Sequence, residues 1–477
     1  NFTGMPNLEY VNLHECSNLE EVHYSLVCCR KLIRLDLSWC VSLVRFPCVN
    51  VESLEYMGLK YCYKLGKFPE IHGRMKPGIQ IHMRGSGIRE LPSSITQYQT
   101  HITNLDLSGM EKLVALPSSI CRLKSLVSLS VSCCIKLEIL PEEIGKLDNL
   151  EELDASYTLI SRPPSSIVSL NKLKILKFGG FKNRVHFEFP PVAEGLRSLD
   201  YLDLSYCNLI DGGLPEDIGS LTSLKELDLS RNYFEHLPRS IAQLGALRSL
   251  NLSNCERLTQ LPELPPELNI LHVDCHMALK FIHELVTKRK KLQRLKFSPL
   301  YGADDSPRDF IDNLFAHALF QNMSSLRHDI SASENVFTIW HHWNKIPSWF
   351  HHKGTDSSIS VNLPENWYIP DKFLGFAVCY SGRLVDTTAQ LIPVCDDGMS
   401  CMTQKLSLSK HSESDSEHYI HFLFVPFDIL WDTSMANEKT PNDYEIIWIS
   451  FSGEMKEYGL RLLYKEEPEV EALSQIR

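Results

Sequence analysis

The side chains best suited to hydrolytic chemistry gather in one short stretch of the sequence. His351, His352, Asp356 and Ser357 could supply the base, the carboxylate and the hydroxyl of a nucleophilic triad. No G-x-S-x-G spacing surrounds Ser357, so nothing predicts the strained turn that presents such a nucleophile. This histidine pair and the pair at 341–342 also lack cysteines or carboxylates at metal-ligand spacing. We therefore expect neither an enzyme nor a metal site here.

Motifs for other cofactors are missing from the sequence. No G-x-x-x-x-G-K-[ST] phosphate loop occurs, so nucleotide binding is not assigned to this chain. The 15 cysteines are an odd number without a C-x-x-C pair, which argues against a disulfide framework and against a zinc site. Unpaired cysteines fit a reducing compartment best. We expect no catalytic activity and no cofactor in this chain.

The charge balance changes along the chain. Residues 1–297 hold 35 Lys and Arg against 33 Asp and Glu, whereas residues 298–477 hold 13 against 26. The net charge of −11 argues against a general nucleic-acid-binding surface, and no apolar run of 18 or more residues predicts a membrane span. We therefore expect neither nucleic acid nor a membrane as a partner. Because 477 residues exceed one hydrophobic core, the change in charge predicts a domain boundary after residue 297.

A repeat of about 24 residues is the strongest pattern in the first domain. Copies of L-x-x-L-x-L-x-x-C follow one another at spacings of 21 to 26 residues, which is the length of a leucine-rich repeat. We expect twelve to thirteen repeats within residues 1–297. Their starts are Leu8, Leu32, Leu54, Gly78, Ile102, Leu126, Leu150, Leu173, Leu199, Leu224, Leu247, Leu268 and a truncated copy at Leu292.

The alternation inside each copy predicts a short strand with one buried and one open face. No single copy can bury its leucines alone, so neighbouring copies must stack and share one core. This predicts an α/β solenoid, a horseshoe whose concave face is a parallel β-sheet. The copy at residues 32–40 illustrates the split, with Leu32, Leu35 and Leu37 inward and Arg34, Asp36, Ser38 and Trp39 outward.

Two further repeat positions have expected structural roles. The return segments often read L-P-x-x-I, and proline suits a connection outside the strand ladder because it has no amide to donate. The ninth position often carries cysteine, which we expect to turn inward and remain an inert, compact apolar side chain. These cysteines are Cys16, Cys40, Cys62, Cys134, Cys207 and Cys255.

The eighth repeat position holds the candidate protein-binding residues. Large amphipathic side chains on a rigid concave surface are those that most often dominate protein interfaces. The alternative is that these aromatic rings stack on their neighbours and only shield the sheet. The candidates are Glu15, Trp39, Tyr61, Tyr157, Tyr206 and Arg231. A nearby series could pair with a basic partner, although we favour ordinary repeat filler: Asp36, Asp106, Asp154, Asp203 and Asp228.

A basic run at residues 288–291 resembles a nuclear-import patch. It follows apolar residues at repeat spacing, so we favour the solvated face of the last repeat. Beyond it, the spacing of apolar residues in 309–326 predicts one helix that leads the second domain. Alternating runs from residue 359 onward then predict the strands of an antiparallel β-sandwich over 298–477. They lie at 359–363, 374–378, 420–424, 447–451 and 460–464.

The second domain contains the motif Ile346-Pro347-Ser348-Trp349-Phe350, followed by Leu363-Pro364, Trp367 and the run Leu374 to Cys379. With this motif it resembles the post-repeat region, also called C-JID, of plant TIR–nucleotide-binding–leucine-rich-repeat (TNL) disease-resistance receptors. The cysteine-bearing repeats with L-P-S-S-I connections resemble the repeats of the same receptors. The resemblance extends over essentially the whole chain. Because the first residue is Asn1 rather than Met, we expect a piece excised from a longer protein. The matching motif residues, which we expect to be mainly structural, are Ile346, Pro347, Trp349, Phe350, Leu363, Pro364, Trp367, Gly375, Phe376 and Cys379.

The resemblance implies the recognition region of an intracellular immune receptor. Such a region would bind a pathogen effector protein through its concave face and post-repeat domain. It would then control its own nucleotide-binding and TIR domains, which this chain lacks, and the receptor would oligomerise when activated. The implied location is the cytoplasm, with the nucleus as a further site. An extracellular leucine-rich-repeat binding module is the alternative, which paired capping disulfides, a leader and dense glycosylation sequons would favour.

Overall fold

The computed structural model describes residues 1–76, 78–91, 102–180, 185–193, 195–261, 263–274, 294–298, 338–341, 346, 350–393, 402–407, 420–431 and 439–464. Backbone contacts divide the chain into two compact units, Asn1–Glu267 and Leu268–Arg477. The strand β15 (Arg294–Ser298) runs across the predicted domain boundary, which stays a prediction.

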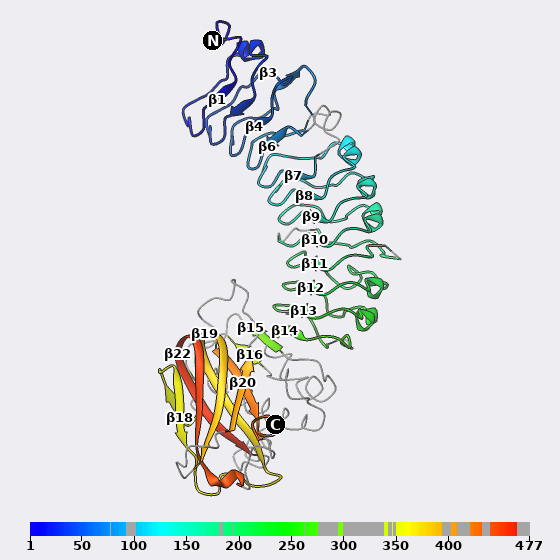
Figure 1. Cartoon of the computed structure of the whole chain (residues 1–477). Helices are drawn as coiled ribbons and strands as arrows, with labels where there is room; N and C mark the ends of the chain where they lie inside the picture. The colour runs from blue at the N-terminus through cyan, green and yellow to red at the C-terminus, as the bar shows by residue number, and fades with distance from the viewer. Residues whose placement is uncertain are drawn as a thin grey trace. The chain divides into compact units, whose positions relative to one another are not determined.

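The first unit is a solenoid of short parallel strands, as Figure 1 shows. Paired strands are in register within two sheets, β1-β2-β4-β6 and one that begins at β7, and the amide of Gly85 donates to the carbonyl oxygen of Ser108 at 2.8 Å between them. The strands are β1 (Tyr10–Asn12), β2 (Arg34–Asp36), β4 (Tyr56–Gly58), β6 (Gln80–His82), β7 (Asn104–Asp106), β8 (Ser128–Ser130), β9 (Glu152–Asp154), β10 (Ile175–Lys177), β11 (Tyr201–Asp203), β12 (Glu226–Asp228) and β13 (Ser249–Asn251).

The predicted inward leucines form the core of this unit. Leu32, Leu35 and Leu37 are fully buried. Across adjacent strands Leu176 lies opposite Leu202, so that equivalent leucines stack along the solenoid. Removing such side chains from water is the main stabilising contribution that a stack of repeats can make. The predicted solenoid fold is confirmed.

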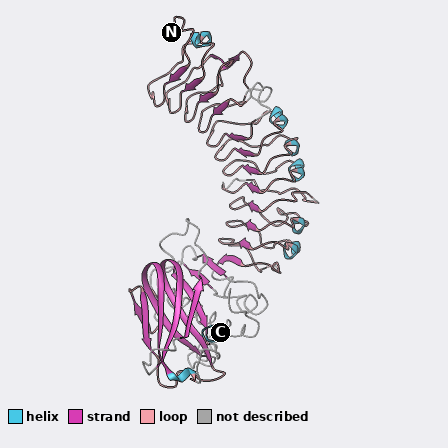
Figure 2. Ribbon diagram, viewed as in Figure 1, coloured by secondary structure: helices cyan, strands magenta, loops and turns pink. Residues whose placement is uncertain are grey.

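The return segments form short 3-10 helices and a small second sheet (Figure 2). Pro117 precedes one helix with extended backbone, and Ile120 inside that helix is fully buried. The proline therefore stands outside the ladder, as predicted. The elements are η1 (Tyr24–Cys28), η2 (Ser118–Arg122), η3 (Ile144–Lys146), η4 (Ser165–Ser169), η5 (Ile218–Ser220), η6 (Arg239–Gln243), and the paired strands β3 (Cys48–Asn50) and β5 (Glu70–His72).

The second unit is rich in β-structure. Two 21-residue strands, β19 (Phe373–Pro393) and β22 (Tyr444–Tyr464), pair antiparallel along their length. Three parallel strands, β14 (Ile270–Asp274), β15 and β16 (Thr338–His341), join them through β21 (Ile420–Pro426). The remaining elements are β17 (His352–Gly354), β18 (Ser358–Asn362), β20 (Met402–Ser407), α4 (Phe427–Leu430) and η8 (Pro441–Asp443).

Two predicted strands of this unit are one strand. The segments 447–451 and 460–464 both belong to β22, because the polar residues between them continue the pairing with β19 through register shifts. Residues from both halves of β19 and β22 share one apolar core, including Phe376, Leu391 and Ile449. The predicted β-rich second region is confirmed, while the predicted leading helix at 309–326 lies outside the described residues.

Candidate protein-binding surface

The candidate residues at the eighth repeat position all have left-handed backbone. Each follows a strand at the turn that leads away from the sheet, where glycine is the residue with the least steric cost. Glycine does occupy this position in three repeats, at Gly85, Gly109 and Gly180. The φ values are 61° for Glu15, 64° for Trp39, 59° for Tyr61, 58° for Tyr157, 56° for Tyr206 and 59° for Arg231.

The aspartate series stabilises these turns. The Asp154 carboxylate accepts a hydrogen bond at 3.0 Å from the amide of Ser156, the residue just before Tyr157. An Asx turn of this kind holds the backbone where the left-handed residue begins. The same contact recurs at Asp36, Asp106, Asp203 and Asp228, at 2.9 to 3.1 Å. These aspartates are thus structural parts of the repeat, which agrees with the favoured interpretation.

The aromatic side chains of the row lie against the next repeat. The rings of Trp39 and Tyr61 are 4.2 Å apart. Tyr61 in turn covers Gly85, since a Cβ built there would come within 2.5 Å of the tyrosine ring, and Tyr157 covers Gly180 at 2.6 Å in the same way. Stacking is therefore present, as the alternative interpretation proposed.

Stacking leaves much of the row open to solvent. Trp39 is 41% exposed and Tyr157 is 48% exposed, and Glu15 and Arg231 are also exposed, whereas Tyr61 and Tyr206 are half-buried. Rings held on one side by the next repeat have little rotamer freedom left to lose on binding. The row is thus a rigid, partly apolar surface suited to a protein partner.

Aromatic residues also stand at the third repeat position, which the sequence reasoning did not select. Tyr10 is 63% exposed at the first strand. On the next two strands the Arg34 guanidinium lies 3.7 Å from the centre of the Tyr56 ring, a cation–π contact. The sequence pattern could have identified these aromatic residues, because the third position points outward by the same alternation that placed the leucines inward.

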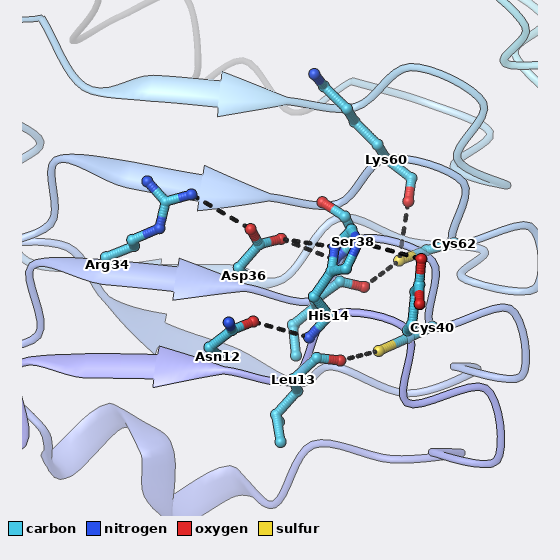
Figure 3. A network of polar contacts seen from close by, with 11 residues as sticks. Asn12, Leu13, His14, Arg34, Asp36, Ser38, Cys40, Lys60 and Cys62 are labelled. Carbon is cyan, nitrogen blue, oxygen red and sulfur yellow. Dashed lines mark hydrogen bonds and ion pairs between the residues drawn. The ribbon is translucent and has the colours of Figure 1, made fainter.

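The ninth-position cysteines form a row of thiols inside the solenoid. The Cys40 thiol donates to the carbonyl oxygen of Leu13, and the Cys62 thiol to that of Leu37, both at 3.1 Å (Figure 3). Burial raises the pKa of Cys40 to about 11 and that of Cys62 to about 12. The expectation of inert, inward cysteines holds for these residues and for Cys134, Cys207 and Cys255, which are buried and bonded alike.

Cys16 departs from this expectation. It is exposed, unlike Cys40 and Cys62. The prediction that this thiol is buried was wrong. A repeat position buries a side chain only where a neighbouring repeat covers it.

Alkylation of the native protein at pH 8 should modify Cys16 and Cys28 while sparing Cys40 and Cys62. The first two are exposed, whereas burial keeps the others protonated and out of reach of the reagent. Peptide mass mapping after iodoacetamide treatment measures this, with urea-unfolded protein as the control in which all four react. Equal labelling of Cys62 and Cys16 in the folded chain would contradict the buried row.

The motif residues of the second unit are mostly core. Trp367 is 3% exposed, and its indole N–H donates to the Tyr444 carbonyl oxygen at 2.9 Å. Ile346 and Phe350 pack against Gly459, where a Cβ would come within 2.8 Å of both. Leu363, Phe376 and Cys379 are also buried, Gly375 lies at a register shift in β19, Pro364 is exposed, and Pro347 and Trp349 lie outside the described residues.

The stretch considered for hydrolysis lies at the surface. His351, His352, Asp356 and Ser357 are all exposed. Among the described residues no group of three or more His, Cys, Asp or Glu side chains could hold a metal ion. In the same residues no helix is long and apolar enough to cross a membrane. The basic run 288–291 lies outside the described part of the chain.

Comparison with protein families identifies the parts of the chain. Residues 341–469 match the C-JID domain. Residues 50–139 match the leucine-rich repeats of disease resistance protein RPS4B-like proteins, and residues 214–256 match a general leucine-rich-repeat model. The chain therefore consists of leucine-rich repeats and a C-JID domain.

Individual relatives are plant disease-resistance proteins. The chain is 74% identical, over its whole length, to 42% of TMV resistance protein N of Nicotiana glutinosa. It is 32% identical over 78% of its length to disease resistance-like protein DSC1 of Arabidopsis thaliana, and 25% identical over 94% to disease resistance protein RPS4B of the same plant. The predicted resemblance to the repeat and post-repeat region of TNL receptors is confirmed. The chain spans 31% to 42% of the length of these relatives.

Among solved structures, leucine-rich-repeat proteins match this chain. A leucine-rich-repeat protein of Leptospira interrogans aligns with 66% of this chain and 95% of its own, at 23% identity and a TM-score of 0.31.

Proposed function

We propose that this chain is the recognition region of an intracellular plant immune receptor and that it binds a pathogen effector protein. The observation that carries the proposal is the eighth-position row, which presents exposed aromatic and charged side chains on a rigid scaffold. Proteins named for resistance match 94% to 100% of the chain, which supports the same assignment.

The receptor would use this region as a sensor for domains that lie elsewhere in its sequence. Effector binding would release the nucleotide-binding and TIR domains, and the activated receptor would assemble into an oligomer in the cytoplasm or the nucleus. The chain itself would need no cofactor and no catalytic residue for that role. The buried thiols of Cys40 and Cys62, which donate to backbone carbonyl oxygens, suit a reducing compartment and favour this location over the extracellular alternative.

Glycine substitutions at Trp39, Tyr61, Tyr157, Tyr206 and Arg231 test the surface. Because glycine already occupies this position in three repeats, the variants keep the left-handed turn and remove only the side chain. The wild-type chain is first screened against individually purified pathogen proteins by biolayer interferometry. For the protein that binds, we expect at least two of the five variants to weaken affinity about tenfold or more, as interface anchors do.

The matched control is Tyr24→Ala, which removes a tyrosine that is 64% exposed on η1, in a return segment. It should leave the affinity within a factor of about two, the size of effect expected away from an interface. Unchanged affinity in all five glycine variants would reject the row as the binding surface.

A further inference from the structure

The outward face of the first four strands is cationic. The third, fifth and seventh repeat positions of β1, β2, β4 and β6 carry three cations, Arg34, Lys60 and Arg84, against one carboxylate, Asp36. Arg34 pairs with Asp36 at 3.4 Å and Arg84 pairs with Asp106 of β7 at 3.9 Å, and the two arginine side chains stay 48% and 54% exposed. Burial first, and then the nearby Lys60 charge, lowers the pKa of His82 on the same face. A neighbouring cation therefore acts on that histidine.

The outward face of strands β9 to β12 is anionic. The same three positions carry five carboxylates and one ammonium, that of Lys177. Burial first, and then the carboxylates of Asp203 and Asp228, raises the pKa of Tyr201 between them. The five carboxylates are Glu152, Asp154, Asp203, Glu226 and Asp228.

These carboxylates differ from the ones at the flank of the same repeats. Glu151 pairs with Lys174 at 2.7 Å, and Asp200 pairs with Lys225 at 3.0 Å. Within the described ranges, none of the five outward carboxylates makes an ion pair with Lys or Arg. The flank is neutralised by ion pairs, whereas Asp154, Asp203 and Asp228 on the sheet face accept hydrogen bonds from uncharged serine amides, and with Lys177 the face keeps a net negative charge.

Strand β7, with Asp106 among its outward residues, and the uncharged strand β8 separate the two regions. The outward positions of β8 and its turn are all serine, at Ser128, Ser130 and Ser132. The face thus changes from cationic over the sheet of β1, β2, β4 and β6 to anionic over the parallel strands β9 to β12 of the next sheet. From β4 to β11 there are six strand intervals of about 4.8 Å each, or roughly 29 Å, which about nine extended residues span.

We propose that this sheet face binds a protein segment of opposite polarity, with its acidic end over β2 to β6 and its basic end over β9 to β12. The proposal rests on the proposed recognition function and adds the chemistry and orientation of the partner. The free-energy cost of desolvating a charge is offset only by a nearby opposite charge. A partner in the reverse orientation would therefore meet like charge at both ends. Electrostatic steering over the divided face also speeds the correct encounter.

A pair of synthetic peptides tests this with the intact chain. The block peptide carries six glutamates, a nine-residue Gly/Ser linker and six lysines, and the scrambled peptide has the same composition with the charges alternating. By fluorescence anisotropy in 50 mM salt, the block peptide should bind at least tenfold tighter, and 500 mM salt should remove the difference. Equal binding of the two peptides in 50 mM salt overturns the proposal.

Variants and cross-linking then fix the orientation. Glu152→Gln with Glu226→Gln should weaken block-peptide binding at least fivefold, whereas Glu142→Gln with Glu216→Gln changes net charge equally on exposed return-side residues and should not. A photo-cross-linker at the lysine end should label tryptic peptides that contain β9 to β12, and labelling of β2 to β6 instead overturns the proposal. If the chain discriminates between the two peptides but binds no effector through the eighth-position row, only the proposed function is refuted. If it binds an effector but does not discriminate between the peptides, only this inference is refuted.

Discussion

Replacing Asn232 by alanine should destabilise the solenoid by about 3 kcal/mol, because it leaves several buried backbone groups without their hydrogen-bond partner. The Asn232 side chain is 1% exposed. Its oxygen accepts from the amides of Cys207 and Leu209 at 3.1 and 3.0 Å. Its nitrogen donates to the carbonyl oxygens of Leu204 and Leu229 at 2.9 and 2.8 Å, so one residue joins two repeats.

A graded series isolates these hydrogen bonds. Asn232→Cys should lose about half as much as Asn232→Ala, because a thiol at this position donates to the preceding repeat, as Cys255 does to Leu229, but cannot accept from two amides well. Asn171→Ala, at an exposed position on the return side, serves as the control and should change stability by less than about 0.5 kcal/mol. Urea unfolding followed by circular dichroism measures all three, and equal midpoints for the two Asn232 variants would show that packing, not bonding, sets the cost.

The sequence predicted the solenoid because one physical rule controls both pattern and fold. A strand of alternating side chains cannot bury its leucines without a neighbour, so the period of the leucines fixes the stacking of the strands. The same rule could not show that the eighth position is left-handed, since Trp39 and Tyr61 are unusual residues for that backbone. Glycines occupy the same position in other repeats, as at Gly85, and this feature of the sequence could have predicted the left-handed backbone.

The second region was harder to predict from its residues. Polar residues between two apolar runs normally mark a turn, and in β22 they continue a single strand. A long strand can carry such residues because its pairing partner β19 follows it through register shifts. The exposed Cys16 is a further case, in which the position in the repeat alone did not decide burial. Burial and strand pairing both depend on partners that the local sequence does not contain.

Replacing Trp367 by alanine should cost the second unit about 4 kcal/mol and open its central strands. The indole lies 5.0 and 5.8 Å from the rings of Phe373 and Phe376 and 5.8 Å from that of Phe427. Aromatic pairs at these distances contribute beyond the area that they bury. The variant would leave a large cavity there and remove the hydrogen bond to the Tyr444 carbonyl oxygen.

Hydrogen exchange with mass spectrometry measures this opening locally. Peptides that cover 373–381 and 444–451 should exchange about a thousandfold faster in Trp367→Ala, since each tenfold change corresponds to about 1.4 kcal/mol. Trp367→Phe keeps most of the ring packing and should lose only the indole hydrogen bond, with an increase of about tenfold. Trp39→Gly, which removes an exposed tryptophan from the first unit and keeps its left-handed backbone, is the matched control. Retained protection in Trp367→Ala would mean that the motif tryptophan does not hold the β-rich core together, and its presence in the motif would then need a binding role.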